Sequence, residues 1–109
     1  MRPLKKKETP TKIESLKIIV RLLNEEDINK RQLPINITGV VITDIATDSP
    51  IINYMQVNDI IVEVQKTKID NINQLKTLLL KNTTQEEYTL LFTIYNNQNQ
   101  RRYIGIKIK

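Results

Sequence analysis

Gly39-Val-Val-Ile-Thr-Asp-Ile45, followed by Ser49-Pro50 and by Asn58-Asp-Ile-Ile-Val-Glu-Val64, decides the fold of this 109-residue chain. The two runs of β-branched and apolar residues predict strands over residues 39–45 and 60–64. The second run alternates only weakly, so we expect a strand that is buried on both faces. The Ser-Pro pair predicts a turn that opens one helical turn through about Tyr54.

Two helices are predicted from their capping signals. Asn24 precedes three acidic residues, which suit the positive end of a helix dipole, and this helix should stop near Leu33-Pro34. Asn71 and Gln74 resemble a capping box, and the helix that they open should run to about Lys81.

The second predicted helix carries an apolar stripe. At 100° per residue, one face of this helix collects the side chains that should enter the core, namely Leu75, Leu79, Ile72 and Leu78. Leu80 falls on a different face, beside Asn73 and Thr77. That leucine is therefore either a surface residue or part of a binding site.

The flanking segments complete a mostly β chain. We expect a linker over residues 1–13, a strand over 16–23, a brief return strand from Ile69, a loop over 82–87, and strands over 88–95 and 101–108 around a hairpin loop at 96–99. The last strand places isoleucine at every second position, which is the period of a half-buried strand.

The composition excludes several kinds of chemistry. The chain has no His and no Cys, so it holds no Ser-His-Asp triad, no cysteine nucleophile and no usual zinc site. Its apolar runs are too short to span a membrane, and its charged start lacks the apolar stretch of a signal peptide. The length allows a single domain.

The net charge of +5 is confined to the N-terminal end. Residues 1–21 contain seven basic and two acidic residues, whereas residues 22–109 contain ten of each. We interpret the basic end, which includes Pro3 and Pro10, as an extended linker. A tether to nucleic acid or to an anionic membrane is the alternative.

The order of the central motifs resembles a PDZ domain of the bacterial HtrA (Do/Deg-type) serine proteases. That family reads roughly G-V-V-V-T-x-V, S-P-A, G-D-V-I-x-x-V-N-G and then a helix with spaced leucines. The resemblance covers residues 15–109 and is closest to the C-terminal, second PDZ domain. It implies a partly open barrel of five to six strands capped by two helices, with a linker over 1–13 and the domain over 14–109.

The resemblance also implies a function. In that family, PDZ domains of periplasmic proteases bind exposed C-termini of unfolded proteins or dock against neighbouring subunits of an oligomer. This chain would then be a non-catalytic module without cofactor or metal, with no nucleic-acid partner and no membrane insertion. The alternative is a structural docking domain whose groove is vestigial.

A peptide-binding site follows by the same resemblance. Ser15-Leu-Lys-Ile18 stands where the family has its carboxylate-binding loop, so the amides of Leu16, Lys17 and Ile18 would hold a terminal carboxylate. The peptide would add as a strand beside residues 18–22, and Leu80 would form an apolar pocket with Leu16, Ile18 and Val20. The predicted site comprises Ser15, Leu16, Lys17, Ile18, Ile19, Val20, Asn73, Thr77 and Leu80.

Several positions depart from the family pattern. Ser15 and Lys17 replace the two loop glycines, Asn58 replaces the glycine of the G-D pair, and Gln65-Lys66 replaces the N-G turn. Asn is the residue best able to take over a left-handed glycine position. These changes represent either compositional drift around an intact groove or the loss of binding.

Other candidate sites have simpler explanations. Three adjacent acids at 25–27 suit a helix start better than a metal site. Ser49 has no His partner in the chain and no Lys spaced as a base, so we interpret it as a turn residue.

Overall fold

The computed structural model describes residues 10–81 and 88–108. Its elements in chain order are β1 (Thr11–Ile13), β2 (Ile18–Leu22), α1 (Glu25–Arg31), β3 (Val40–Ile45), β4 (Ile60–Val64), β5 (Thr67–Lys68), α2 (Ile72–Lys81), β6 (Tyr88–Tyr95) and β7 (Arg101–Ile108). The expected strands at 88–95 and 101–108 are confirmed, and so is the helix ending at Lys81.

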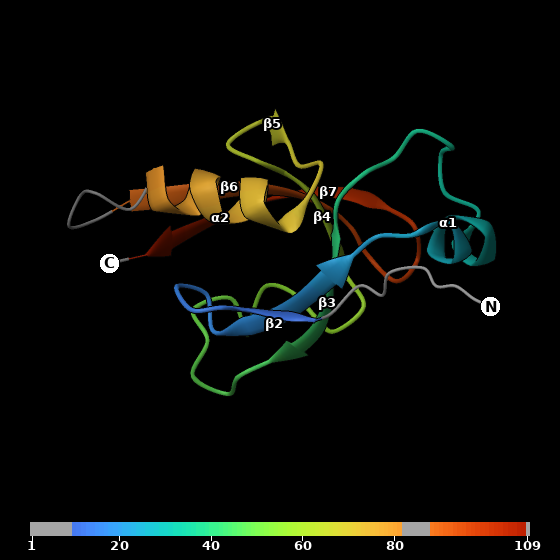
Figure 1. The fold of residues 1–109 in the computed structure, drawn as a ribbon. Helices are drawn as coiled ribbons and strands as arrows, with labels where there is room; N and C mark the ends of the chain where they lie inside the picture. The colour runs from blue at the N-terminus through green and yellow to red at the C-terminus, as the bar shows by residue number, and fades with distance from the viewer. Residues whose placement is uncertain (1–9, 82–87, 109) are drawn as a thin grey trace.

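The strands form one antiparallel sheet of seven strands, in the order β1-β2-β3-β4-β6-β7 with β5 attached to β4. Register shifts at Ile19/Val20 and at Ile61/Glu63 interrupt the pairing of β2 with β3 and of β4 with β6. Such bulges bend a sheet. The expected mostly β, partly open barrel capped by two helices is confirmed. Figure 1 shows α2 along one side of the strands and α1 at the end away from the C-terminus.

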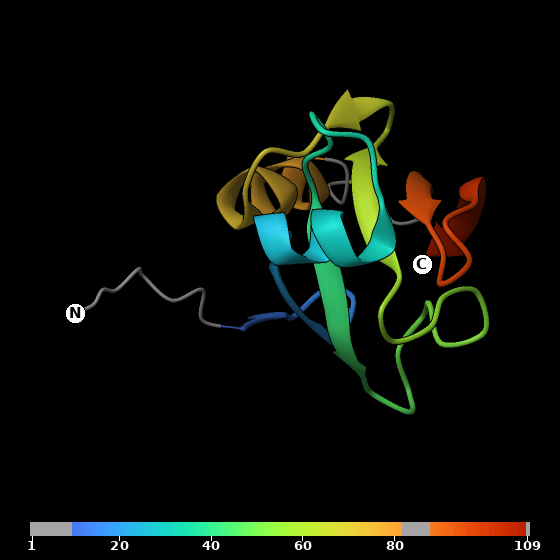
Figure 2. The same cartoon turned by 90° about the vertical axis from the view of Figure 1, so that its right-hand side faces the viewer.

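Among the described residues, the core forms two clusters on the two sides of β4. The main cluster includes Leu75 and Leu79 of α2, with Ile72 and Leu78 packed against it, as the apolar stripe predicts. The smaller cluster lies with α1, whose Ile28 packs against it. Neighbouring residues of β4 enter different clusters, so the prediction that this strand is buried on both faces is confirmed. Figure 2 shows α1 on the near side of the sheet.

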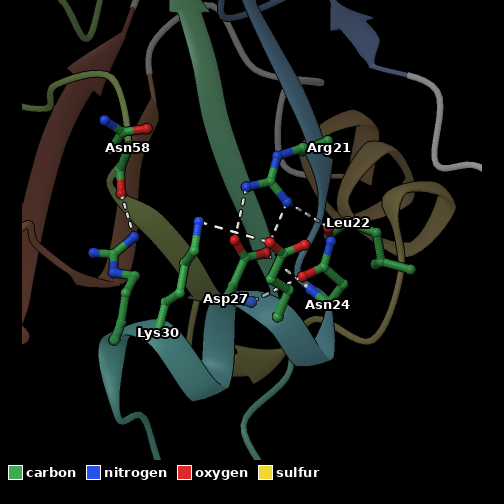
Figure 3. A network of polar contacts seen from close by, with 8 residues as sticks. Arg21, Leu22, Asn24, Asp27, Lys30 and Asn58 are labelled. Carbon is green, nitrogen blue, oxygen red and sulfur yellow. Dashed lines mark hydrogen bonds and ion pairs between the residues drawn. The ribbon is translucent and has the colours of Figure 1, made fainter.

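The first helix is held by a network of polar contacts around its N-terminus (Figure 3). The Asn24 side chain accepts the Asp27 N–H at 2.9 Å, and the Asp27 carboxylate accepts the Asn24 N–H at 3.0 Å. Arg21 of β2 adds two bonds to the same carboxylate, at 2.7 and 2.8 Å. The acids at 25–27 therefore serve the helix start, and no metal-binding group occurs among the described residues.

The second helix uses a variant of the predicted capping box. The Asn71 side chain accepts the Gln74 N–H at 2.8 Å. The Gln74 side chain, however, accepts the N–H of Asp70 at 2.8 Å rather than that of Asn71. Within the described residues, neither helix has the length or the apolar character that crossing a bilayer requires.

Four local predictions differ from the structure. The strand expected over residues 16–23 is β2, Ile18–Leu22, because residues 16 and 17 belong to the turn that follows β1. Residues 11–13, which the sequence places in the linker, form β1, because they pair with β2 along the chain's first turn. Residues 50–54 form turns rather than an assigned helix, although Met55 N–H still donates to Ile51 O at 3.1 Å. The return strand begins at Thr67, two residues before Ile69. The expected loop at 82–87 and most of the linker lie outside the described residues.

Candidate functional site

The turn between β1 and β2 gathers two backbone N–H groups on one oxygen. The N–H groups of Leu16 and Lys17 both donate to the carbonyl of Ile13, with N···O distances of 3.3 and 2.8 Å. Lys17 has a left-handed backbone with φ = 55°. Lys17 N–H also donates to Glu14 O at 3.3 Å, so both donors are used within the turn itself. Successive N–H groups that converge can also receive an anion in their place.

The segment 46–51 makes hydrogen bonds to the carbonyl groups of this turn. The buried Ser49 hydroxyl donates to Leu16 O at 2.6 Å and accepts the Ile51 N–H at 3.1 Å. Ala46 N–H donates to Lys17 O at 3.0 Å. The segment 46–51 therefore fixes the carbonyls of two successive peptide units.

The fixed carbonyls determine where the opposite N–H groups point. A trans peptide unit is planar, and its N–H points away from its C=O. Because Leu16 O and Lys17 O are held by the segment 46–51, the N–H groups of Lys17 and Ile18 are directed away from that segment. The direction of these two donors is thus set by contacts that do not involve β1.

The first strand occupies one edge of β2. The Cα partners are Thr11 with Val20, Lys12 with Ile19, and Ile13 with Ile18, and the pairing is antiparallel. Since β3 pairs with the other edge of β2, both edges are occupied. The Ile13 side chain is only 2% exposed and belongs to the main core cluster.

A cavity of about 360 Å³ lies between this turn and the second half of α2. Its lining residues are Lys12, Ile13, Glu14, Ser15, Lys76, Leu79 and Leu80. Leu80 is 73% exposed and supplies an apolar wall from α2. Lys12 from β1 and Lys76 from α2 also line the cavity. The cavity suits an aliphatic group next to a polar end.

The charge of Lys17 is already paired. Its ammonium lies 2.8 Å from the Asp48 carboxylate, and both side chains are exposed. The hydrogen bond from Lys17, with the attraction of its charge, holds the pKa of Asp48 below its ordinary value. The Lys17 side chain thus points to Asp48.

The structure brings together some of the predicted site residues. Ser15 and Leu80 line the cavity, and the amides of Leu16 and Lys17 converge on one oxygen. Asn73 and Thr77 are exposed on α2 and are not among the residues that line the cavity.

The predicted pocket wall lies elsewhere. Leu16, Ile18 and Val20 are fully buried in the main core cluster, and Ile19 is half-buried on β2. None of the four lines the cavity. Ile13 lines it in their place, because β1 sits along this edge of β2.

Sequence reasoning missed the part that Ile13, Glu14, Lys76 and Leu79 play in the cavity. A local signal existed, since Thr11-Lys-Ile13 has β-branched residues at both ends of a three-residue alternation. Such a triplet just before a turn is typical of a short hairpin strand.

A second cavity, of about 490 Å³, lies between the loop that precedes β4 and the β6–β7 hairpin. Asp59 lies at its wall, is only 4% exposed, and accepts the Gln56 N–H at 2.9 Å. Burial raises the pKa of its carboxyl above the ordinary value, against the effects of that bond and of Arg31. Tyr54 and Tyr103 also line this cavity and are exposed.

Comparison with models of known protein families finds no match, and comparison with curated proteins finds none either.

Proposed function

We propose that this chain is a non-catalytic, PDZ-like module of a Do-type serine protease, and that it binds hydrophobic C-terminal peptides by strand addition. The support from the sequence is the order of its motifs. The support from the structure is that β1, the start of the 14–17 turn and α2 line a small apolar cavity beside converging backbone donors. Strand addition to β2 on this side requires the peptide to displace β1.

One observation carries this proposal. The turn donates two N–H groups to a single oxygen at the end of an extended segment, and that segment's last side chain is buried. A peptide C-terminus has the same parts, with a carboxylate in place of the carbonyl. Hydrogen bonds to a charged acceptor contribute about 1.5–3 kcal/mol each, against about 0.5–1.5 kcal/mol for a neutral one.

The residues that stand at the glycine positions of the family pattern keep the backbone conformation that such a loop uses. Lys17 has φ = 55° and Asn58 has φ = 82°, both in the left-handed region. Gln65 and Lys66 also have positive φ, at 54° and 66°. These values support compositional drift around a preserved backbone rather than the loss of the loop.

The second candidate is a docking domain with a vestigial groove. It is favoured by β1, which takes the edge of β2 and the two converging N–H groups. Under this alternative, the exposed Tyr54 and Tyr103 beside the second cavity would contact another subunit or domain. Comparing the sedimentation of the parent protein with and without residues 10–109 tests it, because only a docking domain changes the oligomer when it is removed.

The resemblance also places the parent protein in the periplasm, as an oligomeric protease of protein quality control. On this proposal the partners are C-termini of unfolded proteins or neighbouring protease subunits, and the catalytic domain lies on another part of the parent. No cofactor takes part in strand addition, which uses only backbone donors and an apolar pocket.

Amide NMR shifts test the proposal directly. The chain is titrated with peptides that end in Val, Leu or Ile, each with a free carboxylate and as the C-terminal amide. We expect micromolar binding, about −8 kcal/mol, for the free acids. The shifts should centre on the amides of residues 16–18 and on Leu80. Equal shifts with the amidated peptides would contradict carboxylate capture, and shifts confined to residues 1–9 would contradict binding in the groove.

A further inference from the structure

We propose that the outer edge of β7 is a separate interaction site, which receives an extended acidic segment of another protein as an added antiparallel strand. This edge lies at the opposite end of the strand order from β1 and β2, and the inference does not rest on the proposed function. The expected segment has acidic residues opposite Arg101 and Arg102, an aliphatic residue opposite Ile104 and an aromatic residue opposite Gly105.

The strand β7 is a long and regular edge strand. It has eight residues, and within the described part of the chain its only strand partner is β6. It contains no proline, and its register with β6 is unbroken from end to end. Figure 2 shows the β6–β7 hairpin, in orange and red, at one outer side of the molecule. Such an edge is a template on which another chain can pair.

The hairpin register determines which backbone groups of β7 point outward. The Asn96 N–H donates to Gln100 O at 3.0 Å, so these two residues form a hydrogen-bonded pair. Hydrogen-bonded and non-hydrogen-bonded pairs alternate along an antiparallel ladder. Arg101, Tyr103 and Gly105 therefore stand in non-hydrogen-bonded pairs with β6. Their N–H and C=O groups point away from β6, toward the place of an added strand.

This edge is open to solvent. Arg101, Tyr103 and Gly105 are all exposed, and the exposed surface of Gly105 is backbone, because glycine has no side chain. A Cβ at Gly105 would meet only the methyl group of Thr89, at 3.9 Å. The sheet face beside this glycine is therefore open as well. An aromatic side chain of a neighbouring strand can cover such an edge glycine.

Charge favours an acidic partner over a second copy of this chain. The sequence of β7 contains three basic residues and no acidic one. Arg101 lies 3.4 Å from Glu63, whereas Arg102 contacts the neutral carboxamide of Gln100 at 3.4 Å. Two paired copies of β7 would gather six basic residues, three from each copy, and their mutual repulsion opposes the pairing. An acidic strand has the opposite effect, because cross-strand pairs of opposite charge are stabilising.

A preformed cavity adjoins the same edge. It has a volume of about 490 Å³ and is lined by residues of β7, Ile104 among them, and by residues of the 53–59 loop. Arg31 holds the two walls together with hydrogen bonds to Asn58 O at 2.8 Å and to Asn96 O at 2.9 Å. Directly opposed residues of paired strands share a face of the sheet. A side chain opposite Ile104 would therefore point to this cavity, and such pockets give strand addition its specificity.

A peptide capped at both ends tests the proposal on the full chain. The probe is acetyl-Glu-Thr-Tyr-Leu-Thr-Glu-Glu-amide, which places its tyrosine opposite Gly105, its leucine opposite Ile104 and its last two glutamates opposite Arg102 and Arg101. It lacks the terminal carboxylate on which the proposed function depends. In an amide NMR titration, we expect the largest shifts at residues 101, 103 and 105. The same peptide with Gln in place of Glu should bind about tenfold more weakly at low salt, and this difference should shrink at high salt.

Two substitutions at Gly105 separate backbone pairing from other contacts. Proline at this position removes the outward N–H and leaves the β6–β7 ladder intact, as edge strands allow, whereas alanine keeps the donor. Gly105→Pro should therefore weaken binding about tenfold or more, and Gly105→Ala should bind like the unmodified chain. Arg102→Gln should also weaken binding, and Lys30→Gln is its control, because Lys30 is exposed on α1 and carries the same charge.

Each outcome decides the proposal, once NMR spectra show that the variants are folded. Absence of probe binding overturns it, as does equal binding by Gly105→Pro and Gly105→Ala. If Gly105→Pro does not fold, equal binding by Arg102→Gln and Lys30→Gln overturns it. Sedimentation that shows dimers of the unliganded chain, with the probe competing for the same edge, would assign the edge to a second copy and would also overturn it. Failure at the β7 edge leaves carboxylate capture beside β2 standing, because free-acid peptides test that site.

Discussion

Replacing Ser49 by alanine removes the contact that holds the candidate site from behind. Ser49 is 3% exposed, and its hydroxyl donates to Leu16 O at 2.6 Å and accepts the Ile51 N–H at 3.1 Å. In Ser49→Ala the carbonyl and the N–H both lose this partner in a buried environment. A buried polar group without a partner costs about 1–3 kcal/mol, so we expect a loss of about 2–4 kcal/mol in the free energy of unfolding.

Urea denaturation followed by circular dichroism measures this loss. Small domains usually unfold in two states, so the transition gives the free energy of unfolding, and a loss of this size is large against a typical stability of about 5–15 kcal/mol. Thr47→Ala is the matched control, since Thr47 is an exposed β-hydroxyl residue in the same loop. We expect it to change stability by less than about 0.5 kcal/mol. If both variants lose the same small amount, Ser49 does not hold the turn.

The same variant should weaken peptide binding in the fraction that stays folded. Without Ser49, the peptide unit between Leu16 and Lys17 is no longer anchored, so the N–H of Lys17 loses its fixed direction. We expect at least tenfold weaker binding of a free-acid peptide, measured by NMR titration below the unfolding transition. Unchanged binding in a destabilised but folded variant would refute the argument that segment 46–51 orients the donors.

Three further predictions concern the folded state. Gly39→Ala should lower the free energy of unfolding, measured by urea denaturation, by about 3 kcal/mol or more, because Gly39 has φ = +154° and a Cβ there would lie 2.4 Å from a backbone oxygen of β4. Gly105→Ala is the control and should be neutral or slightly stabilising, because its added Cβ meets only a methyl group at 3.9 Å. Similar losses of stability in both variants would refute this argument. Burial raises the pKa of Asp27, but the hydrogen bonds from Arg21 and from the Asn24 N–H outweigh this effect and leave the pKa below 3.8. The carboxylate therefore stabilises the fold above about pH 4, and this contribution is lost as the pH falls through the folded-state pKa. Asp27→Asn should lose about 1–2 kcal/mol in the free energy of unfolding at pH 6 and much less at pH 2. The contribution of Asp59 to stability depends on pH in the opposite direction, because its pKa is raised and stability falls as the pH rises from 3.8 through the folded-state pKa. Asp59→Asn should remove that decrease. If the stability of the variant changes between pH 3 and pH 7 as that of the unmodified chain does, this prediction is wrong.

Elements with strong local signals could be predicted from the sequence. The strands at 88–95 and 101–108 match β6 and β7 at both ends, because alternating apolar residues flank an asparagine-rich turn. Asn71 marks the start of α2, and its side chain does cap the helix. In each case the interaction that forms the element lies within a few residues, so a short window of sequence contains it.

The missed strand shows where local reasoning ends. Thr11–Ile13 is too short to be distinguished from the end of a linker after Pro10, and its assignment as a strand depends on pairing with β2 across the turn. The walls of the cavity depend on the same pairing. Once β1 lies on β2, Ile13 is buried at the wall of the cavity, and Leu16 and Val20 are covered within the core.

The scarcity of glycine bears on whether the groove is vestigial. A left-handed backbone costs an ordinary residue about 1–2 kcal/mol, yet Lys17, Asn58 and Gln65 all adopt it. Each is held by a contact outside its own turn. Ala46 N–H binds the Lys17 carbonyl, the Asn58 N–H donates to Ile42 O at 2.8 Å, and Gln65 exchanges two 2.7 Å bonds with Leu91. These tertiary bonds offset the strain that glycine at these positions would have avoided. The shape of the turn at residues 14–17 is therefore set by contacts with segment 46–51 as well as by its own residues.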